Sequence, residues 1–127
     1  MTTTVQMFDP AREKQRLSLQ EIWQVGCRDQ VLSSHDREHF VKLARNRFYT
    51  FQMGLQHLLL VEKDPDKLEP LIRGLVTELF EAPGLAKLWH ESEFCEGKYG
   101  RLVSRQLKRR EIRSRVEAWF RWQAPPR

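Results

Sequence analysis

The sequence predicts an all-α fold, a compact bundle of four to five helices around one long central helix. Across Ser34–Glu62 apolar residues recur at alternating spacings of four and three, which is typical of an amphipathic helix. Residues 71–80 repeat a wide apolar face at i, i+1, i+4 and i+5. A chain of 127 residues with 40% hydrophobic content is long enough to bury a proper core without a metal or a disulfide.

The first predicted helix follows a short polar start. Residues 1–8 are small and polar with no period, and we expect them to be flexible. Asp9 followed by Pro10 is typical of a helix N-cap and a first helical position. The helix that begins there is expected to end near Gly26, because glycine accepts the left-handed conformation that is common after a helix.

The central helix is predicted to begin at a serine cap, Ser33 or Ser34, with Val31 and Leu32 tucked beneath it. At about 1.5 Å per residue this helix would span ~43 Å, so it either protrudes from the domain or bends near Gly54. Its aromatic residues spread over more than one narrow stripe. That spread predicts core helices on two sides of it.

Two further helices are predicted after a proline break. Asp64-Pro65 disfavours helix, and Asp66 with Glu69 three residues later resembles a capping box for a new start. The third helix then covers residues 71–80 and is expected to be the main packing partner of the central helix. An Ala-Pro-Gly sequence ends it, and residues 85–89 form a short fourth helix.

The last predicted helix begins at Tyr99 and contains a shift of its apolar face. Counting about 100° per residue, the later apolar residues lie well over a quarter-turn away from the earlier ones. The shift coincides with Lys108–Glu111, so the helix either bends there or leaves the domain. We therefore divide the chain into a helical domain, residues 1–107, and a basic, aromatic C-terminal helical extension, residues 108–127.

Charge is concentrated in the same C-terminal region. The chain carries a net charge of +5, but from Arg101 onward nine basic residues stand against two acidic ones, a net +7, which leaves −2 for residues 1–100. Such an asymmetry concerns partners rather than fold. The candidate partner-binding residues are basic and aromatic side chains of this end: Arg105, Lys108, Arg109, Arg110, Arg113, Arg115, Trp119, Phe120, Arg121 and Trp122.

We predict a non-catalytic helical interaction or regulatory module that binds a protein partner, or a second copy of itself, through this helix. Nucleic-acid binding is the alternative, because basic residues neutralise phosphates and tryptophan or arginine planes stack on unpaired bases. The same pattern is typical of a helix that lies on an anionic membrane surface. It is also typical of a terminal helix that packs Trp119 and Phe120 on its own domain and leaves its arginines in water.

A weaker alternative is a metal-dependent enzyme that uses His35 and His39. Their i, i+4 spacing places both imidazoles on one helix face, as in zinc peptidases. The acid after the first histidine is Asp36 rather than a glutamate, and no third ligand follows at the expected spacing. No other catalytic motif is present, so the sequence gives no positive support for an enzyme and predicts no cofactor.

Cysteine placement and hydropathy predict a cytoplasmic protein. Cys27 and Cys95 stand far apart and outside any CxxC spacing, so we expect free thiols in a reducing compartment. The longest unbroken apolar run, Leu58–Val61, is far shorter than the ~20 residues needed to span a bilayer. The N-terminus also lacks the pattern of a signal peptide.

Four segments of the chain resemble one protein family: EIW at Glu21–Trp23, DREHF at Asp36–Phe40, NRFYTFQMG at Asn46–Gly54 and APGLAKLWHES at Ala82–Ser92. The family comprises small bacterial all-helical domains of uncharacterised function, in which Pro-Gly and then Trp follow a long aromatic helix. The resemblance covers Leu17 to about Leu107. It implies the helical fold and no activity, and the basic tail from Lys108 lies outside it.

Overall fold

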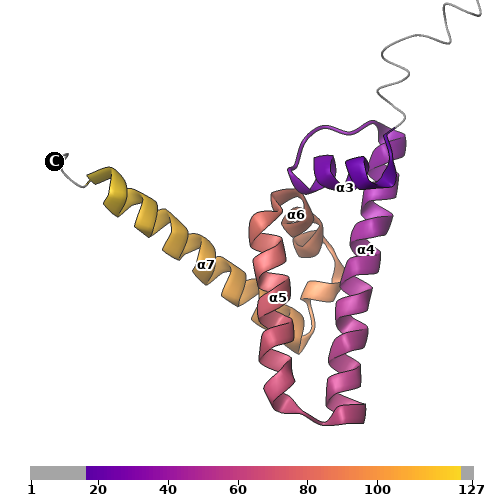
Figure 1. The fold of residues 1–127 in the computed structure, drawn as a ribbon, viewed down its shortest axis with the longest axis vertical. Helices are drawn as coiled ribbons and strands as arrows, with labels where there is room; N and C mark the ends of the chain where they lie inside the picture. The colour runs from indigo at the N-terminus through magenta and orange to yellow at the C-terminus, as the bar shows by residue number, and fades with distance from the viewer. Residues whose placement is uncertain (1–16, 124–127) are drawn as a thin grey trace, which may run out of the picture.

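The computed structural model describes residues 17–123, and within them the protein is all-α (Figure 1). Five α-helices lie within the described residues: α3 (Leu19–Cys27), α4 (Ser34–Gln56), α5 (Leu68–Glu81), α6 (Pro83–Glu91) and α7 (Lys98–Gln123). A π-helical turn extends α4, and two 3₁₀ turns lie in the connections: η1 (His57–Glu62), η2 (Pro65–Lys67) and η3 (Glu93–Cys95). The predicted helical bundle is confirmed.

The bundle is arranged around α4 and α5, which lie side by side and run in opposite directions (Figure 1). The short helices α3 and α6 contact each other at the end where α4 begins. α7 packs against α5 and then leaves the bundle. Among the helices, α4 makes its most extensive contacts with α3. The prediction that residues 71–80 form the main partner of the central helix is therefore wrong.

A capping box starts α3. The Ser18 hydroxyl accepts from the Glu21 backbone N–H at 3.1 Å, and the Glu21 carboxylate accepts from the Ser18 N–H at 3.3 Å. Ser18 has extended backbone angles, so the prediction of one helix running from Asp9-Pro10 to Gly26 is wrong at this point. Residues 1–16, which include the expected flexible start and the expected cap, lie outside the described residues.

Two glycines let α3 lie close to its neighbours, Gly84 at the contact with α6 and Gly26 at the contact with Phe40 of α4. A Cβ at Gly84 would lie 1.7 Å from the Gly26 carbonyl oxygen, and one at Gly26 would lie 2.3 Å from the Phe40 ring. Gly26 lies within α3, and the left-handed residue after this helix is Asp29, with φ of 58°. The predicted end of this helix near Gly26 is confirmed, because α3 ends at Cys27, but Gly26 lacks the left-handed backbone expected of it and instead permits a close contact.

α4 begins where the sequence predicts. The Ser33 hydroxyl accepts from the Asp36 N–H at 3.2 Å and so caps the first turn. Val31 is 97% exposed, so its predicted burial beneath this helix is wrong, whereas Leu32 is half-buried.

The far end of α4 changes its hydrogen-bonding type without ending the helical segment. π-helical bonding starts at His57, three residues after Gly54, and the turn ends at Lys63, which has a left-handed backbone with φ of 51°. The Asp64 carboxylate then caps η2 by accepting from the Asp66 N–H at 3.1 Å. The predicted capping box with Asp66 as its first residue is wrong, because no side chain caps α5.

The core is built on aromatic contacts between α4 and α6. Phe48 and Trp89 are fully buried with ring centroids 5.1 Å apart, and Phe51 approaches the same indole at 6.2 Å. The Trp89 Nε1–H donates to the Ser104 hydroxyl at 3.0 Å, which joins α6 to α7. The other large side chains with almost no exposure are Leu75, Leu79, Leu85, Val103 and Leu107. The predicted core role of the central helix's phenylalanines is confirmed.

Both cysteines are free thiols, as predicted, and both are half-buried. Burial, with a smaller effect from Glu78, raises the pKa of the Cys27 thiol to about 11. This thiol is therefore protonated and a poor nucleophile at neutral pH. Among the helices of residues 17–123, none is both long and apolar enough to cross a bilayer.

Candidate interaction surface on the last helix

The inner half of α7, Lys98–Leu107, belongs to the core. Gly100 and Val103 are buried along it. A Cβ at Gly100 would lie 2.1 Å from the Phe94 carbonyl oxygen, so a residue without a side chain is required at this contact. From Lys108 to Gln123, which we call the outer half, no residue is buried. α7 thus crosses the predicted domain boundary as one continuous helix.

Arg110 fixes the start of the outer half to α5. Its Nη1 group donates to the Thr77 hydroxyl at 2.6 Å, and its guanidinium carbon lies 4.5 Å from the centroid of the Phe80 ring. Arg110, a predicted partner-binding residue, is therefore engaged within the domain. It marks the side of α7 that faces the bundle, and the half-buried Ser114 continues that side.

The outer half carries an exposed apolar surface, the outer face, formed by Ile112, Val116, Trp119 and Phe120 with Trp122 beside it. Their exposed fractions run from 46% for Val116 to 82% for Trp122. Counting about 100° per residue, the outer face points roughly 170° away from the side that faces the bundle. Trp119 and Phe120 pack edge to face at 5.2 Å. The alternative in which these two rings pack on their own domain is therefore wrong.

A groove runs beside the outer face, between the end of α6 and α7. Its volume is about 530 Å³. The residues that line this basic groove are His90, Ser104, Arg105, Leu107, Lys108, Glu111, Ile112 and Arg115. The structure thus brings three predicted residues, Arg105, Lys108 and Arg115, to one concave surface. Sequence reasoning missed His90, because only the tertiary packing of α6 places it there.

The remaining predicted residues project from the outer half. Arg109, Arg113 and Arg121 are exposed, and the ion pairs found within residues 17–123 join other helices and turns, none of them involving α7. Residues 108–123 contain six basic and two acidic side chains, a net charge of +4. The outer half therefore combines apolar rings with uncompensated positive charge.

The predicted histidine pair lies at the start of α4, far along the chain from this surface. His35 is exposed, His39 is half-buried, and their ring centroids are 4.7 Å apart. Within the part of the chain that the structure describes, no group of three His, Cys, Asp or Glu side chains could hold a metal ion. The described residues therefore offer this pair no third ligand.

Comparisons with protein-family models, with curated proteins and with solved structures find no significant match to this chain. The resemblance to a family of small bacterial helical domains therefore stays a prediction.

Proposed function

We propose that this protein is a non-catalytic interaction module that binds a partner protein through the outer half of α7. The observation that carries the proposal is the outer face, where five large apolar side chains lie exposed on one helix. Contiguous apolar patches of this kind are typical of protein-binding surfaces rather than of ordinary exteriors. Tryptophan and arginine, both present here, are enriched among the residues that dominate binding energy.

Charge favours one kind of partner. Two α7 helices paired in a homodimer would bring two segments of net charge +4 together, which opposes association. An amphipathic helix with acidic flanks would cover the apolar rings and pair with the arginines around them. We therefore favour a protein that presents an acidic amphipathic helix over a second copy of this chain. The free thiols favour a reducing compartment such as the cytoplasm for this encounter.

Two synthetic amphipathic helical peptides test the proposal. They share the same apolar residues, and one has acidic flanks whereas the other has basic flanks. Titrated into the full-length protein and followed by fluorescence anisotropy, the acidic peptide should bind and the basic one should not. Trp119→Ala should weaken binding by more than ~10-fold, the scale of a hot-spot residue.

Tyr49→Ala is the matched control. Tyr49 on α4 and Trp119 have the same exposed fraction, 56%, so loss of an exposed ring is compared at two places. The control should bind the acidic peptide as the unmodified protein does. If neither peptide binds and sedimentation shows only monomers, the proposal fails. A dimer that Trp119→Ala abolishes would instead identify a second copy as the partner.

A second candidate function is nucleic-acid binding, which the basic groove favours. Arg105, Lys108 and Arg115 lie along one concave surface with Trp119 further along the same helix. Cations in a groove neutralise phosphates, and an adjacent exposed ring can stack on a base. Labelled RNA and DNA titrated at low and high salt separate this function from the first. Nucleic-acid affinity must fall steeply as salt rises, and absence of binding at low salt removes this candidate.

A further inference from the structure

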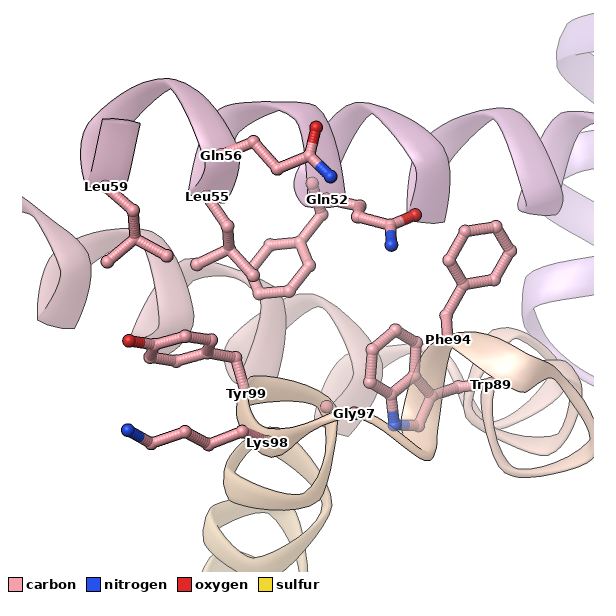
Figure 2. Close-up of a pocket in the computed structure, with 11 residues that line it drawn as sticks. Gln52, Leu55, Gln56, Leu59, Trp89, Phe94, Gly97, Lys98 and Tyr99 are labelled. Carbon is pink, nitrogen blue, oxygen red and sulfur yellow. The ribbon is translucent and has the colours of Figure 1, made fainter. Parts of the chain in front are cut away.

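A hollow lies where the last turns of α4 face the start of α7 (Figure 2). Leu55 and Leu59 line it from α4 and η1, Tyr99 lines it from α7, and Trp89 and Phe94 line its other end. These side chains come from segments far apart in the sequence. For that reason no sequence pattern predicted a site here, and the hollow is separate from the residues of the outer face.

The inner surface of the hollow is apolar and held in place by the core. Trp89 and Phe51 are buried, and the Trp89 indole is fixed by its hydrogen bond to Ser104. Groups positioned by packed helices keep their geometry better than groups on loops. Gly97 contributes no side chain, and a Cβ there would meet no atom within 4 Å, so the hollow stays open on that side.

Polar side chains lie around the mouth. Figure 2 shows the carboxamides of Gln52 and Gln56 extending along the α4 side of the hollow, whereas Lys98 lies on the opposite wall beside Tyr99 with its ammonium group directed outward. The Lys98 Nζ atom lies 5.5 Å from the centroid of the Tyr99 ring. All three polar side chains are exposed, so their N–H groups are accessible to a molecule that enters. An apolar pocket with a few polar groups at its edge is typical of a small-molecule site, and the flexible Lys98 side chain lines this one.

The volume decides the size of the ligand. The hollow measures about 210 Å³. An engineered apolar cavity of roughly 150 Å³ holds benzene, so this one has room for a single ring and a short substituent. Drug-sized ligands ordinarily occupy roughly 300–1,000 Å³, which excludes a nucleotide or a larger cofactor from full enclosure here.

We propose that this hollow binds a small aromatic carboxylate, a molecule with one ring and a short acidic arm. The ring would contact the half-buried Phe94 and Tyr99 side chains, which favour offset or edge-on aromatic packing. The carboxylate would remain at the mouth, where Lys98 supplies positive charge and Gln52 and Gln56 supply amide N–H donors. The proposal does not depend on partner binding by α7.

Phenylacetate and phenylacetamide test it, because they differ only in charge and hydrogen-bonding at the end of the arm. Each is titrated into the full-length protein, and the indole N–H resonance of Trp89 is followed by NMR. Phenylacetate should bind about fivefold more tightly than phenylacetamide, the scale of one exposed charge pair. Lys98→Gln should bring the two affinities together.

Two tryptophan substitutions on η1 test the location. Leu59 points toward Tyr99 in Figure 2, so Leu59→Trp should fill the hollow and abolish binding. Leu60 is 72% exposed and does not line the hollow, so Leu60→Trp should leave binding unchanged. Circular dichroism confirms that both variants fold. Equal affinity for acid and amide, binding that survives Leu59→Trp, or no binding of phenylacetate at millimolar concentration would each overturn the proposal.

Discussion

The two halves of α7 have the same helical backbone and opposite surroundings. The inner half, Lys98–Leu107, packs on α5 and the core, and its apolar side chains are buried or half-buried. The outer half, Lys108–Gln123, carries larger apolar side chains that water reaches. The difference teaches that an apolar helix face stabilises this domain only where another element lies against it. The same residue types beyond Leu107 are therefore available for a partner.

The largest expected effect on stability comes from a substitution in the buried inner half of α7. Leu107 is 1% exposed, so Leu107→Ala leaves a cavity and should lower the free energy of unfolding by about 2–5 kcal/mol. Trp119→Ala removes a larger side chain from the outer half and should change stability by less than ~0.5 kcal/mol, as exposed sites do. Urea denaturation followed by circular dichroism measures both. Equal destabilisation by the two substitutions would refute the division of α7.

A smaller effect is expected at the boundary between the halves. Arg110→Ala removes the hydrogen bond to Thr77 and the contact with the Phe80 ring, which together should contribute about 1–2 kcal/mol. Arg113→Ala removes the same side chain from an exposed position three residues on and should be nearly neutral. If both variants denature at the same urea concentration, Arg110 does not hold α7 to α5.

The smallest effect concerns the connection that leads into the inner half. The Arg45 guanidinium forms an ion pair with Glu93 on η3, and chiefly this hydrogen bond lowers the pKa of Glu93 to about 2. Because the pKa of Glu93 is lowered in the folded state, the ion pair contributes fully to folding stability at pH values above the usual pKa near 4.5. This contribution is lost as the pH falls toward 2. Both side chains are at least half exposed, so the effect is modest.

Melting temperatures measured from pH 5.5 down to about 2 check this ion pair. The Glu93→Gln variant has no carboxylate at residue 93 that acid could protonate. Its melting temperature should therefore fall less over this range than that of the unmodified protein. Other carboxylates titrate in both proteins and cancel in the comparison. Parallel curves for the two proteins would show that the Arg45–Glu93 pair contributes nothing to stability.

Periodicity and turn residues predicted most of the fold, because they act within one helix. The Ser33 or Ser34 cap, the helix over residues 71–80 and the shift of apolar phase near Lys108 were all visible in the sequence. Contacts between helices were not visible. The close approach of Gly84 to Gly26 depends on a neighbour that no local pattern specifies, and no pattern predicted the π-helical turn at His57.

The candidate sites were likewise predictable only where they depend on a single helix. The basic and aromatic residues of the last helix were predicted from composition, but the engagement of Arg110 with Phe80 and the entry of His90 into the basic groove were not. The hollow beside Tyr99 was missed altogether, since its walls come from separate helices.

By itself, the sequence determined that α7 has two apolar faces in different phases, because side-chain direction along a helix follows from residue number alone. Only the tertiary structure decided that the first face is covered by α5 and the core and the second by nothing among residues 17–123. The physical reason is that burial requires a second surface within contact distance. The periodicity of one helix shows which of its faces is apolar, but it does not show which other element, if any, covers that face.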